Sequence, residues 1–218
     1  SRTNEHLQFL ANNDPLTKVL NRRGVEKAMD AARASAREGK AVALAYLDLD
    51  RFKLINDLFG HTAGDEVLQQ VCARVKAMLS GSMSLGRVGG DDFIIVIPDT
   101  PVSLARLLCQ GIVSRIGQEP YRMGEHAFHV RGSIGLIEVS PGTSIKDAVS
   151  SADRACREAK SNHSGLVVFE KNARVFMEHE AELKLVEQLS AHAEIEGLYV
   201  EMQPIMSLST PHASLNFE

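Results

Sequence analysis

Four aspartates in the first half of the chain have the types and spacing needed to bind metal ions. Asp48 and Asp50 lie two residues apart at the end of an apolar run, and Asp91 and Asp92 follow two glycines. Clustered carboxylates repel one another and stay ionised only beside a counter-charge. Ligands that offer only oxygen favour Mg²⁺ or Mn²⁺ over zinc. The chemistry that such a group would serve is metal-assisted phosphoryl transfer.

The elements that would position these acids are strands. The run 41–48 has the length and continuous apolar character of a strand buried on both faces. Two short strands at 84–88 and 93–98 are predicted to form a hairpin around Gly89 and Gly90. In a β-α-β-β sheet the first strand can lie beside this hairpin, which would place up to four carboxylates around one point. The alternative for Asp91 and Asp92 is a tight hairpin with solvated acids at its tip. The alternative for Asp48 or Asp50 is a strand-end carboxylate in a salt bridge.

The remaining pattern predicts an α/β (α+β) domain with a ferredoxin-like β-α-β-β-α-β order and a mainly antiparallel sheet. A turn is expected between Gly60 and Gly64, and bulges are expected at Gly132 and Gly135 of one long strand. A strand is expected to begin near 198, with nothing in this chain to pair with it. Helices are predicted at 3–12, 21–38, 65–79, 101–116, 145–161 and 171–193, and further strands at 126–139 and 166–169.

Several polar residues near the acids suit a nucleotide. Lys53 and Lys160 offer point charges for phosphate, and the small glycines of the hairpin would let a nucleotide approach the backbone. Asn56 and Asp65 together offer the amide and carboxylate that recognise the donor and acceptor edges of a purine. The alternative for each lysine is a solvated surface position. The alternative for Asn56 and Asp65 is a turn residue or a helix cap, since Asp65 would open a helix.

The composition limits the class of protein. The chain has 218 residues, 44% hydrophobic and 24% charged, with a net charge of −4, which suits a soluble domain rather than a nucleic-acid-binding one. Its three cysteines form no CxxC pair, so we expect a reducing, cytoplasmic compartment. No apolar run reaches the ~18 residues that a membrane span needs. We expect this to be a piece of a longer protein whose sensor segment lies outside it.

A set of linked motifs extends across about 14–170. The motifs are Asp14-Pro15-Leu16-Thr17 with Asn21-Arg22-Arg23; the run from Asp48 to Asp57; Gly60-His61-Thr62-Ala63-Gly64-Asp65; Arg87-Val88-Gly89-Gly90-Asp91-Asp92-Phe93; Ser133-Ile134-Gly135; and Ala152-Asp153 with Ala159-Lys160. In their order and spacing these motifs resemble GGDEF domains, a family of diguanylate cyclases.

The resemblance implies a nucleotidyl-cyclase-like palm that condenses two GTP molecules to cyclic di-GMP as a homodimer. It implies that Asp48, the Leu49 carbonyl and Asp91 hold Mg²⁺ or Mn²⁺, with Asp92 at the metal or the attacking hydroxyl. Guanine would be bound by Asn56 and Asp65. The residues implied for the phosphates are Arg51 and Phe52 through their backbone, Lys53 and Lys160, with Gly89 and Gly90 close to the nucleotide.

The chain departs from the family pattern at several positions. Asp92 stands for the signature's glutamate, Arg157 for a tyrosine, and Ser164 for an arginine that would help to hold the phosphates. Ser80 and Met83 occupy the positions of the RxxD pair that binds inhibitory product. The resemblance therefore predicts no inhibitory site and a weakened phosphate site.

The expected organisation is an upstream signalling helix tail at 1–13, a GGDEF domain at 14–171, a linker helix at 172–197 and the start of an EAL domain at 198–218. The last assignment rests on Met202-Gln203-Pro204-Ile205, which resembles the opening of EAL phosphodiesterases. Three functions stay open: an active, weak cyclase; an inactive GTP-binding regulator of an attached EAL domain; and a dimerisation domain without nucleotide. The retained metal and guanine positions favour the first.

Overall fold

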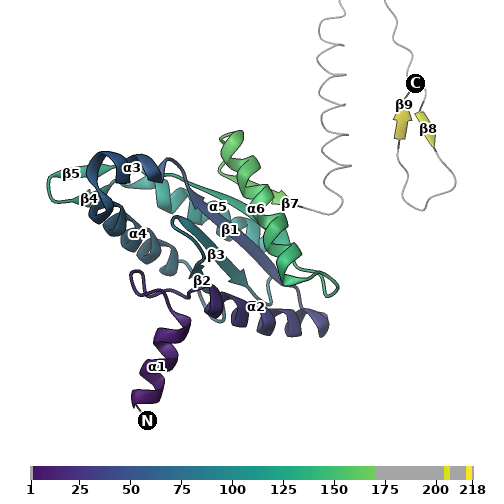
Figure 1. The fold of residues 1–218 in the computed structure, drawn as a ribbon. Helices are drawn as coiled ribbons and strands as arrows, with labels where there is room; N and C mark the ends of the chain where they lie inside the picture. The colour runs from purple at the N-terminus through teal and green to yellow at the C-terminus, as the bar shows by residue number, and fades with distance from the viewer. Residues whose placement is uncertain (1, 170–203, 207–214, 218) are drawn as a thin grey trace, which may run out of the picture. The chain divides into compact units, whose positions relative to one another are not determined.

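The computed structural model describes residues 2–169, 204–206 and 215–217 (Figure 1). No helix among these residues has the length and apolar character needed to cross a membrane. Residues 1–170 form one compact unit and 171–218 another. The predicted helix at 171–193 falls outside the described residues.

The helices are α1 (Arg2–Asn12), α2 (Arg22–Arg37), α3 (Phe52–Phe59), α4 (His61–Lys76), α5 (Val102–Gln118) and α6 (Ile145–Ser161). The strands are β1 (Ala43–Leu49), β2 (Ser84–Arg87), β3 (Asp92–Ile97), β4 (Tyr121–Met123), β5 (His126–Phe128), β6 (Gly132–Glu138), β7 (Leu166–Phe169), β8 (Pro204–Met206) and β9 (Leu215–Phe217).

A five-stranded sheet in the order β2-β3-β1-β6-β7 carries the first unit. Neighbouring strands run antiparallel, except β6 and β7, which run parallel. With β7 set aside, the strands and the helices that connect them follow the predicted β-α-β-β-α-β order. The ferredoxin-like, mainly antiparallel fold is confirmed.

Helices cover both faces of this sheet (Figure 1). Met29 of α2 and Ala152 of α6 pack with Leu44 of β1 on one face. On the other face, Leu68 of α4 and Ile112 of α5 pack in the larger core, which also contains the alternate residues of β1. The sheet is therefore buried on both sides, as the continuous apolar run of β1 predicts.

The structure confirms the predicted start of α2 at Asn21 and its predicted end before Gly39. The Asn21 side chain accepts a hydrogen bond from the Gly24 amide at 2.9 Å and caps the helix. Gly39 adopts a φ of 86° just beyond its end, a conformation that glycine reaches without steric cost.

Three expectations about local structure are wrong. The turn between Gly60 and Gly64 is instead the junction of α3 and α4, and Gly64 lies inside α4. The strand predicted at 126–139 is two strands: β5 pairs with β4 in a small ribbon, and β6 belongs to the main sheet. The C-terminal strand does find a partner, because β8 pairs with β9.

The glycines of β6 are not bulges, since the pairing of β1 with β6 runs without interruption from Ala43↔Glu138 to Leu49↔Gly132. Gly135 instead allows a close approach of α6. A Cβ at this position would collide with the backbone carbonyl of Ala152 and the backbone amide of Cys156.

We therefore expect Gly135→Ala to destabilise the domain by about 3 kcal/mol or more, as overpacking against rigid backbone does. Urea denaturation would measure the change. Gly142→Ala is a matched control, because a Cβ there meets nothing within 4 Å. Equal stability of Gly135→Ala and the wild type would show that α6 can move away from the sheet at little cost.

Candidate metal and nucleotide site

Three of the four predicted acids come together at one end of the sheet. Asp48 of β1 lies directly opposite Asp92 of β3 in the strand register, and Asp91 precedes Asp92 in the hairpin. Carboxylate oxygens of these three residues lie within 4.8 Å of one another. Asp50 does not join this group and accepts a hydrogen bond from the Ser133 hydroxyl at 2.9 Å. The expectation of four acids around one point is corrected to three.

Burial and the charge of Asp48 destabilise the ionised forms of Asp91 and Asp92. Burial, and then the charge of Asp48, raises the pKa of Asp91 to about 6. The same two causes, in the same order, raise the pKa of Asp92. The Oδ1 atom of Asp48 is buried and has no hydrogen-bond partner. An oxygen-only group with a bare buried acceptor fits a hard divalent cation, which would supply the missing positive charge.

Lys160 supplies part of that charge without a metal. Its Nζ atom on α6 contacts Asp48 Oδ2 at 2.8 Å, with both side chains partly buried. The sequence placed this lysine among the phosphate ligands, and the structure places it at the acids. A cation bound by Asp48 would compete with Lys160 for that carboxylate and free its ammonium group for a nearby anion.

The segment after β1 offers backbone groups to an anion. The side chain of Leu49 is a buried hydrocarbon without a ligand atom, so this residue can offer a metal only its backbone carbonyl. Arg51 has a φ of 57°, a strained conformation for this residue type that often marks functional sites. Phe52 begins α3 directly after it, so the first turn of this helix, where anions commonly bind backbone N–H groups, lies just beyond the end of β1. Lys53 is exposed on this turn.

The two residues predicted to bind guanine lie on adjacent helices. The side chain of Asn56 on α3 packs against Gly64 of α4, where any Cβ would collide with its Oδ1 atom. Exposed Asp65 follows Gly64 directly. The amide and the carboxylate are therefore held on neighbouring positions of a rigid helix pair. Gly89 and Gly90 are exposed in the hairpin beside the acids, which leaves their backbone open to a ligand.

Arg87 anchors the hairpin, and this role was not predicted. Its Nε donates to the Gly90 carbonyl at 2.9 Å, and its Nη1 contacts Asp14 Oδ2 at 3.3 Å. Asp14 in turn accepts hydrogen bonds from the amide and hydroxyl of Thr17. The motif at 14–17 therefore acts by fixing the hairpin that carries Asp91.

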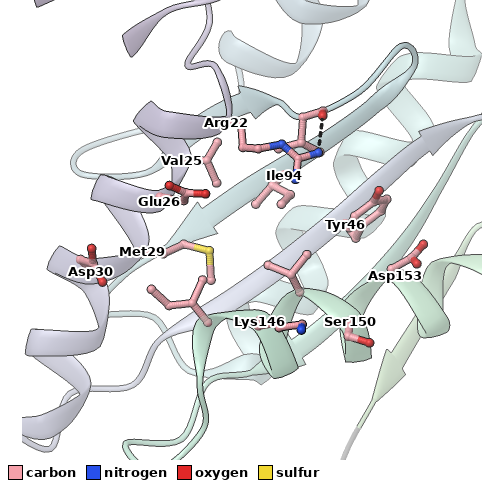
Figure 2. Close-up of a pocket in the computed structure, with 13 residues that line it drawn as sticks. Arg22, Val25, Glu26, Met29, Asp30, Tyr46, Ile94, Lys146, Ser150 and Asp153 are labelled. Atoms are coloured by element: carbon pink, nitrogen blue, oxygen red, sulfur yellow. Dashed lines mark hydrogen bonds between the residues drawn. The ribbon is translucent and has the colours of Figure 1, made fainter. Parts of the chain in front are cut away.

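Tyr46 is a second residue that sequence reasoning missed. It lines a cavity of about 630 Å³ between α2 and α6, and Asp153 of α6 lines the same cavity (Figure 2). Burial, and then the charge of Asp92, raises the pKa of its phenol, and its hydroxyl in turn favours the ionised form of Asp92. The available signal was spacing, because Tyr46 and Asp48 are alternate residues of one strand and share a face.

Arg157 and Ser164, two residues that depart from the family pattern in and just after α6, lie in different surroundings. Arg157 is exposed and forms an ion pair with Asp153 at 3.1 Å, one helical turn earlier. Ser164 lies beyond the helix, where its hydroxyl donates to the Leu166 carbonyl at 3.4 Å. Neither side chain contacts the acids.

Comparison with known proteins identifies this arrangement. A family model described as "Diguanylate cyclase, GGDEF domain" matches residues 11–165. The chain belongs to the GGDEF family. The matched range contains the acids, the hairpin and Lys160, so the site described above lies wholly in the GGDEF domain.

Curated relatives of this GGDEF domain are longer proteins. The chain is 31% identical over 207 residues to the bifunctional diguanylate cyclase/cyclic di-GMP phosphodiesterase MucR of Pseudomonas aeruginosa, covering 94% of this chain and 30% of MucR. It is 35% identical over 180 residues to the cyclic di-GMP phosphodiesterase PdeR of Escherichia coli, covering 80% of this chain and 27% of PdeR. The chain thus spans less than a third of either relative.

Solved structures match the GGDEF domain closely. The diguanylate cyclase SiaD of Pseudomonas aeruginosa, solved with its activator SiaC, has a TM-score of 0.70 at 31% identity, covering 77% of this chain and 65% of that one. The coiled coil and GGDEF domain of DgcB from Caulobacter crescentus, solved with cyclic di-GMP, has a TM-score of 0.71 at 27% identity, covering 77% of this chain and 92% of that one.

Proposed function

We propose that this GGDEF domain binds GTP with Mg²⁺ and condenses two GTP molecules to cyclic di-GMP and pyrophosphate. The observation that carries the proposal is the group of three carboxylates beside Lys160, at the end of the sheet where α3 begins. Relatives named as diguanylate cyclases, including one from Vibrio cholerae at 37% identity, support the same chemistry.

In this proposal Asp48, Asp91 and the Leu49 carbonyl hold the ion, Mg²⁺ or Mn²⁺. When bound, the ion would acidify a 3′-hydroxyl and neutralise charge on the attacked phosphate. Asp92 lies opposite Asp48 and accepts or orients the hydroxyl proton. Each domain holds one GTP, so product formation needs a second copy facing the first, as a homodimer.

The other substrate contacts follow from the helices. Asn56 and Asp65 bind the guanine edge, while Lys53, Lys160 and the backbone of Arg51 and Phe52 hold the phosphates at the start of α3. Gly89 and Gly90 leave room for the nucleotide beside the hairpin. These assignments explain why the chain places a glycine at 64, where a larger residue would displace Asn56.

A second candidate is an inactive GTP-binding regulator of an attached EAL phosphodiesterase. Asp92 in place of glutamate, and Ser164 in place of arginine, favour this function. PdeR and the PdeB protein of Shewanella oneidensis, which is 37% identical over 157 residues, are both named cyclic di-GMP phosphodiesterases. In the parent protein we place a sensor before this domain and an EAL domain after it, with this domain in the cytoplasm.

Turnover distinguishes the two candidates. Concentrated protein is incubated with GTP and Mg²⁺, and the products are separated by chromatography, with Asp91→Ala as the control. Cyclic di-GMP from the wild type alone would support the cyclase. Absence of product together with measurable GTP binding would support the regulator, and absence of GTP binding would refute both.

Cyclic di-GMP is not expected to inhibit this domain. Ser80 is exposed and Met83 is partly buried, and neither offers the cation that a phosphodiester needs. Titration calorimetry with cyclic di-GMP should show no saturable binding at micromolar concentrations. The double variant Ser80→Arg with Met83→Asp is the matched positive control and should gain binding. Tight binding by the wild type would contradict the prediction.

A further inference from the structure

A polar cavity of about 570 Å³ lies at the end of β1, apart from the cavity at Tyr46. The start of β6 and the loop before β7 form two of its walls, and the end of α5 forms another. Backbone hydrogen bonds fix these walls: Asp50 N donates to the Arg131 carbonyl, and Ile134 N to the Gly165 carbonyl, both at 2.8 Å. The cavity is therefore built from the same strand ends as the acid group.

The residues around this cavity suit an anion. Apart from Asp50, whose Oδ1 already accepts a hydrogen bond from the Ser133 hydroxyl, the polar side chains of the cavity are donors or neutral groups. Three glycines add no side chains to its lining. Such a lining matches the oxygens of a phosphate group. The donors and neutral polar side chains are Ser114, Gln118, Arg131, Ser133, His163 and Ser164.

Arg131 is the strongest of these donors. It is exposed, and among the described residues it forms no ion pair. Its Cγ lies 3.9 Å from where a Cβ on Gly117 would be, so its aliphatic stem runs over the end of α5. A guanidinium held in this way can bind two phosphate oxygens at once, which a lysine cannot do.

The cavity also adjoins the strand that carries the metal group. Asp50, which lines the cavity, lies two residues beyond Asp48 and directly after the end of β1. Both sites are therefore reached from the same end of β1, which suits a nucleotide with one phosphate at Asp48 and Lys160 and its outer phosphates in the cavity.

We propose that Arg131 binds the terminal phosphate of GTP in this cavity. The inference rests on the proposed binding of GTP and adds a substrate contact to it. Ser164 lines the same cavity, so the guanidinium of Arg131 supplies there the positive charge that position 164 lacks.

Titration calorimetry of the whole chain with Mg²⁺ tests this contact. The probes are GDP and the slowly reacting α-thio analogue of GTP. Arg131→Ala should weaken binding of the triphosphate by about tenfold or more and leave GDP binding within about twofold of wild type. Arg106→Ala, an exposed arginine of α5, is the control and should change neither. Adding Ser164→Arg to Arg131→Ala should restore triphosphate binding.

The outcomes separate this inference from the proposed function. Wild-type binding of the triphosphate with an unchanged affinity in Arg131→Ala would overturn the role of Arg131 alone. Equal losses for GDP and the triphosphate would also overturn it, because a terminal-phosphate contact cannot affect GDP. A wild type that binds neither nucleotide would overturn GTP binding itself, and the role of Arg131 with it.

Discussion

Replacing Asp91 with asparagine will abolish cyclic di-GMP formation and, above about pH 6, stabilise the metal-free protein. The pKa of Asp91 is about 6 in the folded chain, compared with 3.8 for an unperturbed aspartate. Between these values the folded state holds more protons than the unfolded state. The stability of the metal-free wild type must therefore fall as pH rises through this window. Asparagine removes the charge that burial and Asp48 oppose.

The expected stabilisation is about 1 kcal/mol at pH 7.5, discounted from the ~3 kcal/mol that two pKa units would give because the carboxylate is partly solvated. Loss of a metal ligand should lower turnover at least ~10³-fold. Urea denaturation in EDTA at pH 5 and 7.5, with a turnover assay, measures both effects. Asp30→Asn, an exposed acid of α2, should change neither. An Asp91→Asn protein less stable than wild type at pH 7.5 would show that the carboxylates do not repel one another.

The same proton competes with the metal. As pH falls below about 6, Asp91 becomes protonated in the metal-free site, and the apparent affinity for Mg²⁺ should weaken. A metal that stabilises the fold by binding only the native state should therefore raise the melting temperature more at pH 7.5 than at pH 5.

The strand that carries the site was predictable because its residues are almost all apolar. An apolar run such as 43–47 must be buried on both faces of a sheet, and the acids that follow it must then lie at the end of that strand. The hairpin followed from two glycines between apolar strands. The order of these elements was enough to predict that Asp48 would meet Asp92.

Other parts depend on tertiary contacts that a local pattern does not contain. Helix α3 has only eight residues and follows Arg51, which has a φ of 57°, and no helix was predicted at 52–59. The segment 126–139 has one continuous β pattern, but its first part pairs with β4 and its second with β1. Gly135 was predicted to be a bulge because sequence does not show that α6 packs against it.

The site residues divide in the same way. Asp48 and Asp91 stood out by type and spacing, and Lys160 through the family motif, whereas Tyr46 and Arg131 did not stand out. Tyr46 looks like one more residue of a buried strand, and Arg131 like an ordinary charged residue before a strand. Only the fold brings Tyr46 beside Asp92 and Arg131 into a cavity that Ser164 also lines.

Asp92→Glu will raise turnover by about tenfold or more. The added methylene moves the carboxylate by about 1.5 Å, and displacements of about 1 Å in a reacting group change rates by as much as ~10²-fold. Asp92 now lies where the Tyr46 hydroxyl favours its charge and the Asp48 charge opposes it. A longer side chain can extend beyond Asp48 toward the metal and the attacking hydroxyl. Initial rates of cyclic di-GMP formation measure the effect, with Asp30→Glu as the control.

The same variant tests whether the shorter acid alone explains weak activity. If Asp92→Glu turns over GTP and the wild type does not, the shorter side chain at position 92 alone prevents catalysis. The rest of the site is then able to bind and condense GTP. If both bind GTP and neither forms product, the regulator is favoured, and the defect lies elsewhere than at position 92. If Asp92→Glu is slower than wild type, the contact with Tyr46 must already hold Asp92 where it is needed, and Tyr46→Phe should then lower the wild-type rate.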